Sequence, residues 1–149
     1  MSVTEKDQNL DNLKTMLNEP LELDHDSFFT RLQVGSDTIA SLMQVLRDKY
    51  GLNYLANLTA VDYGPEFEVI YHLYAIPDNG LKLVVKTRIP REKPEMPSIC
   101  SIYPTADWQE REVFDLMGIR FNGHPNLIRV LLPDSFEGHP LRKDFKKEG

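Results

Sequence analysis

The sequence predicts one α+β domain that ends in an extended, irregular C-terminal arm. Its 149 residues, 41% of them apolar, suffice for a single buried core. Apolar residues recur at helical spacing near the N-terminus and again after residue 105, and the stretch between is rich in β-branched and aromatic residues. These observations predict N-terminal helices, a mixed or antiparallel sheet of about four to five strands, and one further helix.

Two helices and a short strand are expected in the first third of the chain. Residues 5–18 carry an apolar stripe that Pro20 ends, and residues 29–34 have a strand-like pattern. The second helix begins near Ser36, and Gly51 is placed to end it in a left-handed conformation. Its apolar stripe consists of Ile39, Leu42, Met43, Leu46 and Tyr50.

The middle of the chain reads as an antiparallel meander of three strands. The expected strands are residues 54–61, 67–76 and 81–89, which are rich in β-branched and aromatic residues. The Asn79-Gly80 pair between the last two tolerates the positive φ angles of a tight hairpin.

The segment before the last helix is expected to be partly irregular. Three prolines in residues 90–97 argue against regular structure and indicate an exposed or partner-covered connection. Residues 98–103 are expected to form one more strand. The last helix should run from a Thr105 cap to Met117 and end at Gly118, with Trp108, Phe114 and Met117 on its buried face.

The periodicity fails after Gly118. Glycines and prolines interrupt every apolar run of the last 31 residues, so no stable helix or hairpin is expected there. Long irregular segments in compact domains tend to be functional or to lie on another surface. We therefore divide the chain into an α+β domain, residues 1–118, and an extended arm, residues 119–149, that is expected to dock on a partner.

Several function classes lack their usual sequence features. Cys100 is the single cysteine, which excludes an internal disulfide, a four-thiolate zinc site and an iron-sulfur cluster held by this chain alone. Glycine-rich phosphate or dinucleotide loops, a nucleophile elbow and a zinc-peptidase helix are not found. The net charge of −6 argues against nucleic acid, and no apolar run approaches the roughly 18 to 20 residues of a membrane span. A cytoplasmic protein that reaches a membrane only through partners is expected.

The densest polar cluster is Glu110-Arg111-Glu112 with Asp115 on the last predicted helix. Arg111 and Asp115 lie about one turn apart and can pair. As a catalytic hypothesis, Glu112 and Asp115 form an acid/base pair or two metal ligands, joined by His124 and His139. No nucleophile or ligand spacing accompanies them, so we favour a charged helix face whose groups bond to backbone amides or arginines and fix the arm. The arginines in question are Arg129 and Arg142.

Two similar tripeptides mark the arm, Gly123-His124-Pro125 and Gly138-His139-Pro140, and an arginine follows each. Proline extends the backbone of the histidine before it, and glycine permits close backbone approach, so the arm should bend around a surface. Hydrogen-bonded structural histidines are favoured over metal ligands because no zinc-like spacing accompanies them.

The closing segment, residues 140–147, mixes apolar side chains with cations. Neither lipid headgroups nor nucleic acid fits it well, because acidic residues dilute its positive charge. Docking onto an acidic partner fits better, with Leu141 and Phe145 as anchors and Arg142 as a fork for a partner carboxylate.

Residues 108–145 closely resemble the hallmark sequence of a known family, the 30 kDa (C) subunit of bacterial NADH:quinone oxidoreductase, respiratory complex I: WQEREVFDLMGIRFNGHPNLIRVLLPDSFEGHPLRKDF. This run covers 38 of the 149 residues and is far more specific than any short motif. Ile128 and Lys146 depart from the family pattern, where a basic residue and a proline are usual. The matching positions are Glu110, Arg111, Glu112, Asp115, Gly123, His124, Pro125, Arg129, Gly138, His139, Pro140, Leu141, Arg142, Lys143, Asp144 and Phe145.

The resemblance implies a peripheral-arm subunit with an α+β fold and no catalytic, cofactor-binding or metal-binding residue of its own. FMN, iron-sulfur clusters and quinone would lie in partner subunits, and the chain would pack beside the large hydrogenase-like quinone-site subunit and the small iron-sulfur subunit. The complex would pass electrons from NADH to quinone, translocate protons and hold this chain at the cytoplasmic face of the cell membrane.

Two alternatives stay open. The first is the equivalent subunit of a membrane-bound [NiFe] hydrogenase, a formate hydrogenlyase or an F420H2 dehydrogenase, because these complexes share the motif. The second, from a different class, is an independent small metal-dependent hydrolase that uses Glu112, Asp115, His124 and His139.

Overall fold

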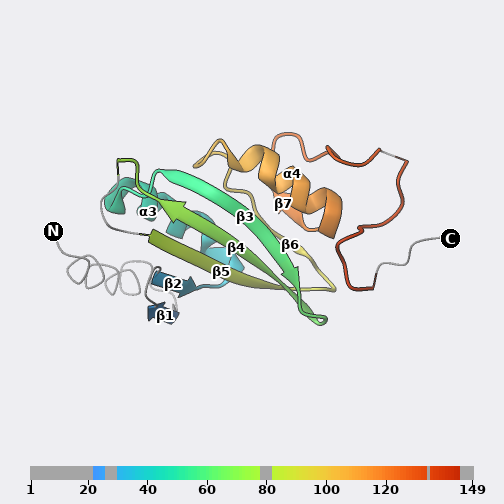
Figure 1. The fold of residues 1–149 in the computed structure, drawn as a ribbon, viewed down its shortest axis with the longest axis horizontal. Helices are drawn as coiled ribbons and strands as arrows, with labels where there is room; N and C mark the ends of the chain where they lie inside the picture. The colour runs from blue at the N-terminus through green and yellow to red at the C-terminus, as the bar shows by residue number, and fades with distance from the viewer. Residues whose placement is uncertain (1–21, 26–29, 78–81, 134, 145–149) are drawn as a thin grey trace.

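The computed structural model describes residues 22–25, 30–77, 82–133 and 135–144, arranged as Figure 1 shows. The predicted helix over residues 5–18 and the predicted Asn79-Gly80 turn lie outside the described residues. The order of elements confirms the predicted α+β class. The elements are β1 (Glu22–His25), β2 (Thr30–Gln33), the 3-10 helix η1 (Ser36–Thr38), α3 (Ile39–Tyr50), β3 (Tyr54–Asp62), β4 (Glu66–Tyr74), β5 (Lys82–Pro90), β6 (Glu95–Pro97), α4 (Ala106–Met117) and β7 (Arg120–Asn122).

Five of these strands form one mixed sheet in the order β1-β2-β5-β4-β3. β3, β4 and β5 are antiparallel neighbours, with Tyr54 opposite Tyr74 and Tyr74 opposite Lys82, which confirms the predicted meander. β2 runs parallel to β5, and α3 leads the chain from β2 to β3 at the far edge of the sheet (Figure 1).

One face of the sheet carries the core. Alternate residues of β4 are fully buried, namely Phe67, Val69, Tyr71 and Leu73, as the two-residue period of a strand requires. The predicted stripe of α3 joins the same cluster through Ile39, Leu42, Met43 and Leu46. Burial of each such side chain stabilises the fold by about 1.5–3 kcal/mol. Helix α3 ends as predicted at Gly51.

A second, small sheet pairs β6 with β7 in parallel, so residues 90–97 and the start of the arm are more regular than predicted. The prolines are compatible with this ladder because they need not donate to it. The carbonyl of Pro94 accepts from the amide of Arg120 at 2.8 Å, and the amide of Ser98 donates to the carbonyl of Asn122 at 2.8 Å.

The strand predicted over residues 98–103 is wrong. This segment is a turn in which the amides of Ile102 and Tyr103 both donate to the carbonyl of Ile99 at 2.9 Å. The three side chains are buried, and their spacing of three and four residues is that of a helical turn rather than of a strand. The Tyr103 hydroxyl donates to the carbonyl of Leu52 at 2.6 Å, which ties this turn to the end of α3.

Helix α4 lies beside the edge strand β3 (Figure 1). The Gln109 side chain accepts from the amide of Leu58 at 2.6 Å and so occupies an edge group that could pair with another strand. Met117 is buried as predicted, but Trp108 was predicted wrongly, because its side chain is 49% exposed and its indole donates to Glu112 at 2.5 Å. Thr105 precedes the helix but makes no side-chain cap bond.

No helix among the described residues is long and apolar enough to cross a lipid bilayer.

Candidate functional site

The buried carboxylate of Asp115, on α4, fastens the arm. Its Oδ2 accepts from three successive arm amides, those of Val130, Leu131 and Leu132, at 3.1, 2.7 and 2.9 Å. Arg129 Nη1 lies 3.2 Å from Oδ1. Burial raises the pKa of Asp115, but the three amides and Arg129 outweigh burial and hold it below its ordinary value. The predicted charged face that bonds to arm amides and Arg129 is therefore confirmed for Asp115.

The arm also closes the last turn of α4, where a helix leaves its carbonyls without partners in the helix. The carbonyl of Phe114 accepts from the amide of Gly118 at 2.8 Å, and that of Asp115 accepts from His139 Nδ1 at 3.0 Å. The two remaining carbonyls take arm donors as well. Leu116 accepts from the amide of Leu141 at 3.0 Å and Met117 accepts from Arg142 Nε at 2.6 Å. An arginine at this negative end of the helix is also electrostatically favourable.

Gly118 permits this close packing. Its φ of 77° is left-handed, and a Cβ there would lie 2.6 Å from Arg142 Nη2 and 2.7 Å from His139 Cδ2. Glycine thus ends the helix and leaves space for two arm side chains.

Both histidines are structural, as predicted. His124 Nδ1 accepts from the amide of Asn126 at 2.9 Å, and Nε2 faces the carbonyl oxygen and the carboxylate of Asp107 at 3.1 and 2.9 Å. These partners assign the proton to Nε2. His139 Nδ1 donates to the carbonyl of Asp115, which assigns its proton to Nδ1.

Cys100, Glu110 and His124 form the one group of potential metal ligands that the described residues bring within 4.8 Å of one another. Glu110 is fully buried and accepts from Ser98 Oγ at 2.5 Å and from the amide of Ile99 at 2.9 Å. Burial raises the pKa of Glu110, and each of its two carboxyl oxygens already accepts a hydrogen bond inside the chain. His124 offers no spare lone pair, because Nδ1 accepts a hydrogen bond and Nε2 carries the proton. These residues do not fit a metal.

The other candidate groups on α4 serve separate partners. Arg111 Nε bonds Asp107 at 2.9 Å, so the predicted Arg111–Asp115 pair is wrong: Asp115 is turned toward the arm. Glu112 accepts from Trp108 while Asp115 binds the arm, so neither is an uncommitted acid or base.

The remaining motif positions lie along the arm. Arg129 Nη2 donates to the carbonyl of Gly138 at 2.8 Å, and Gly123 and Gly138 have positive φ. Pro125 is exposed, Pro140 is half-buried and Leu141 is 59% exposed. Phe145 lies outside the described residues.

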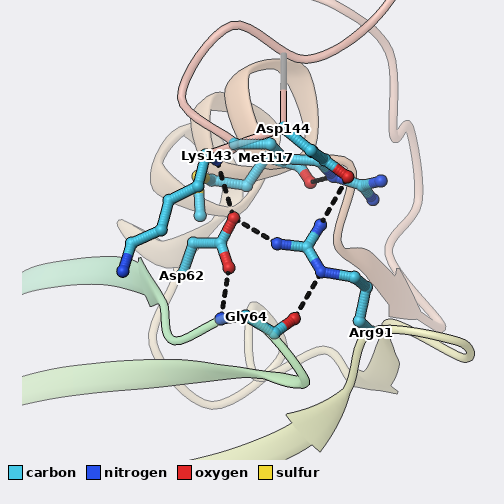
Figure 2. A network of polar contacts seen from close by, with 7 residues as sticks. Asp62, Gly64, Arg91, Met117, Lys143 and Asp144 are labelled. Atoms are coloured by element: carbon cyan, nitrogen blue, oxygen red, sulfur yellow. Dashed lines mark hydrogen bonds and ion pairs between the residues drawn. The ribbon is translucent and has the colours of Figure 1, made fainter.

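A polar network that sequence reasoning missed holds the end of the described arm against the sheet (Figure 2). Asp62 closes β3, and its buried carboxylate accepts from the amide of Gly64 and from the amide of Lys143, each at 2.8 Å, and from Arg91 Nη2. Arg91 Nε donates to the carbonyl of Gly64 at 2.5 Å, and Nη1 lies 3.2 Å from Asp144 Oδ2. We call these five residues the latch.

Electrostatics favour the charged form of the latch. Burial raises the pKa of Asp62, but Arg91 and the two amides outweigh burial and lower it to about 2. The guanidinium carbons of Arg91 and Arg142 lie 4.8 and 5.1 Å from the centroid of the same Phe67 ring. The sequence signal for the latch is weak: a carboxylate stands where β3 should present an apolar core residue.

Fold and site together define a small α+β domain whose C-terminal segment is bound back along its last helix. The chain belongs to the family of the 30 kDa subunit of respiratory-chain NADH dehydrogenase, which matches residues 32–149. The resemblance found in residues 108–145 is thereby confirmed.

Individual relatives agree with this assignment. The C subunit of NADH-quinone oxidoreductase from Moorella thermoacetica is 50% identical over 117 residues, which are 77% of this chain and 78% of the relative. A trypsin-resistant fragment of Nqo5 has a TM-score of 0.70 at 28% identity over 82% of this chain and 99% of the fragment. A chain of the membrane-bound sulfane sulfur reductase, an archaeal respiratory membrane complex, has a TM-score of 0.82 at 28% identity over 95% of this chain and 86% of that chain.

Proposed function

We propose that this chain is a non-catalytic peripheral-arm subunit of NADH:quinone oxidoreductase. It supports electron transfer from NADH through FMN and iron-sulfur clusters to quinone, coupled to proton translocation, and partner subunits hold those cofactors. Its place is peripheral, at the cytoplasmic face of the membrane, beside the large hydrogenase-like subunit and the small iron-sulfur subunit. Family membership and the relative from Moorella thermoacetica support this proposal.

The observation that supports the docking role is that the arm uses its polar groups inside the chain and leaves apolar side chains exposed. Its polar groups bond to α4 and the latch, whereas the apolar side chains of Ile128, Leu131 and Leu141 are 49%, 52% and 59% exposed. Apolar side chains held on an ordered backbone are suited to bury against a partner. Full burial of one leucine contributes about 1.5–3 kcal/mol.

The test separates docking from folding. Both residues changed in the double variant Leu131→Asn/Leu141→Asn are more than half exposed, so the melting temperature of the isolated chain should change little. Two lost leucine contacts of about 1.5 kcal/mol each correspond to a loss of about 100-fold in affinity. Arg142 is unsuitable for this test because it also binds Met117.

The variants are introduced, with a tag, into cells that lack the wild-type chain, and gently solubilised membranes are used for pull-down and mass spectrometry. The wild type should recover iron-sulfur, quinone-site and membrane subunits, and the double variant should recover far fewer. Ile76→Asn is the matched control, because Ile76 is 58% exposed but follows β4 at the other end of the sheet. Normal recovery with the double variant would refute the docking arm, and recovery of the chain alone with bound metal would favour the small hydrolase.

A second candidate function is the equivalent subunit of a related membrane complex with another electron donor, such as a [NiFe] hydrogenase, a formate hydrogenlyase or an F420H2 dehydrogenase. The similarity to a chain of the archaeal membrane-bound sulfane sulfur reductase supports this second candidate, because that chain belongs to a different respiratory membrane complex. Nickel in the eluate of the same pull-down would select a hydrogenase.

A further inference from the structure

Three segments far apart in the sequence meet at the latch: the end of β3 with the turn at Gly64, the residue after β5, and the arm (Figure 2). We infer that Asp62 and Arg91 are positioning residues that hold the end of the arm in its docking conformation before any partner subunit binds. This inference rests on the proposed docking role of the arm.

Asp62 is built as an acceptor for the arm rather than as one half of a simple ion pair. Its side chain is 2% exposed, and Oδ1 and Oδ2 are divided between Gly64 on one side and Lys143 with Arg91 on the other. A carboxylate is needed here, because replacement of either oxygen by an amide NH2 would set a donor against a donor.

Arg91 uses each of its three nitrogens on a different residue, two at the end of β3 and one in the arm. Nε binds Gly64, Nη2 binds Asp62 and Nη1 binds Asp144 of the arm. The planar guanidinium fixes these directions relative to one another, which a lysine could not do. Arg91 therefore fixes the position of the arm relative to the sheet.

The described end of the arm, residues 141–144, needs this fastening because it is otherwise open to solvent. The side chains of Leu141 and Asp144 are 59% and 66% exposed, and the bonds to Leu116 and Met117 lie at the other end of this short segment. A segment that is ordered before binding does not lose that conformational entropy on docking. Its apparent affinity rises in proportion to the population that is already competent to bind.

The first measurement is the hydrogen-exchange protection of the Lys143 amide in the isolated full-length chain. Asp62→Asn should lower this protection at least about tenfold while core amides of β4 keep theirs, because the latch lies at the edge of the core. Lys93→Gln is the matched control: it removes a cation two residues from Arg91, but that side chain is 77% exposed and pairs with the nearby Glu95 at 3.5 Å rather than with the latch. Unchanged protection in Asp62→Asn would overturn the latch.

The second measurement is competition for incorporation. Differently tagged wild-type and variant chains are produced in one cell, and their ratio in the purified complex is divided by their ratio in the cell. Lys93→Gln should give a quotient near one and Asp62→Asn a quotient of about one tenth or less. Lost protection with a quotient near one would overturn the inference and leave the docking arm standing, whereas wild-type chains outside any complex would overturn the docking arm itself.

Asp144→Asn decides the matter if Asp62→Asn fails to fold. Asp144 is mostly exposed and joins the rest of the latch through Arg91 Nη1, so its replacement leaves the buried Asp62–Arg91 pair in place. A several-fold loss of Lys143 protection is expected, and no loss would overturn the latch.

Discussion

Gly118→Ala should destabilise the protein more than the same change at Gly123. The difference between the two losses in the free energy of unfolding measures how much the packing of the arm against Gly118 contributes. Both glycines have positive φ, 77° and 87°, so a Cβ costs about 1–2 kcal/mol of backbone strain at either position. At Gly123 nothing lies within 4 Å of the added Cβ, whereas at Gly118 it would meet Arg142 and His139 below 3 Å. The two arm side chains must then move.

Displacing them breaks two hydrogen bonds, Arg142 Nε to Met117 and His139 Nδ1 to Asp115. Each contributes about 0.5–1.5 kcal/mol, so Gly118→Ala should cost about 2–5 kcal/mol in total against about 1–2 kcal/mol for Gly123→Ala. Urea denaturation followed by the fluorescence of Trp108, the single tryptophan, measures both free energies of unfolding. Equal losses in the two variants would refute the packing of the arm against Gly118.

Three further predictions concern buried polar groups. Asp115→Asn should lower the free energy of unfolding by about 1–2 kcal/mol, because it keeps an acceptor for the arm amides. Asp115→Ala should lower it by about 3–5 kcal/mol. Denaturation curves that reverse this order would contradict the fastening role. The pKa of Asp62 is lowered from 3.8 to about 2, so the contribution of its carboxylate to stability is complete above pH 3.8 and is lost as the pH falls toward 2. In the wild type, the hydrogen-exchange protection factor of the Lys143 amide should fall between these pH values. In Asp62→Asn it should show no such step. Tyr103→Phe removes the hydroxyl bond to Leu52 and should lower the free energy of unfolding by about 1 kcal/mol, and an unchanged value would show that this bond adds no net stability.

Local patterns predicted most of the fold. The stripe of α3 and the meander of β3, β4 and β5 depend on periodicities of a few residues, which a single sequence contains in full. The errors came where one pattern supports two structures. The apolar residues Ile99, Ile102 and Tyr103 predict a strand by their composition, but their spacing suits a turn, which Tyr103 joins to Leu52 just after α3.

Burial of individual side chains on α4 was harder to predict than the helix itself. An aromatic residue is usually buried and a glutamate exposed, yet Trp108 lies outside and Glu110 inside. The reason is a partner that the helix alone does not reveal: Ser98 and the Ile99 amide satisfy the buried carboxylate. Similarly, the latch joins Asp62 to Arg91 and Lys143, which are 29 and 81 residues away in the sequence.

The geometry of the arm gives physical reasons for its histidine and arginine motif. The tripeptide at Gly138 places His139 and Arg142 on the carbonyls that α4 leaves open, and Arg129 with Asp115 holds the preceding stretch. Substitution of any of these residues would therefore disturb the fold and assembly together, and a loss of assembly would not show a direct contact with a partner. Exposed apolar residues such as Leu131 and Leu141 separate the two effects best, because more than half of each residue lies in solvent in the isolated domain.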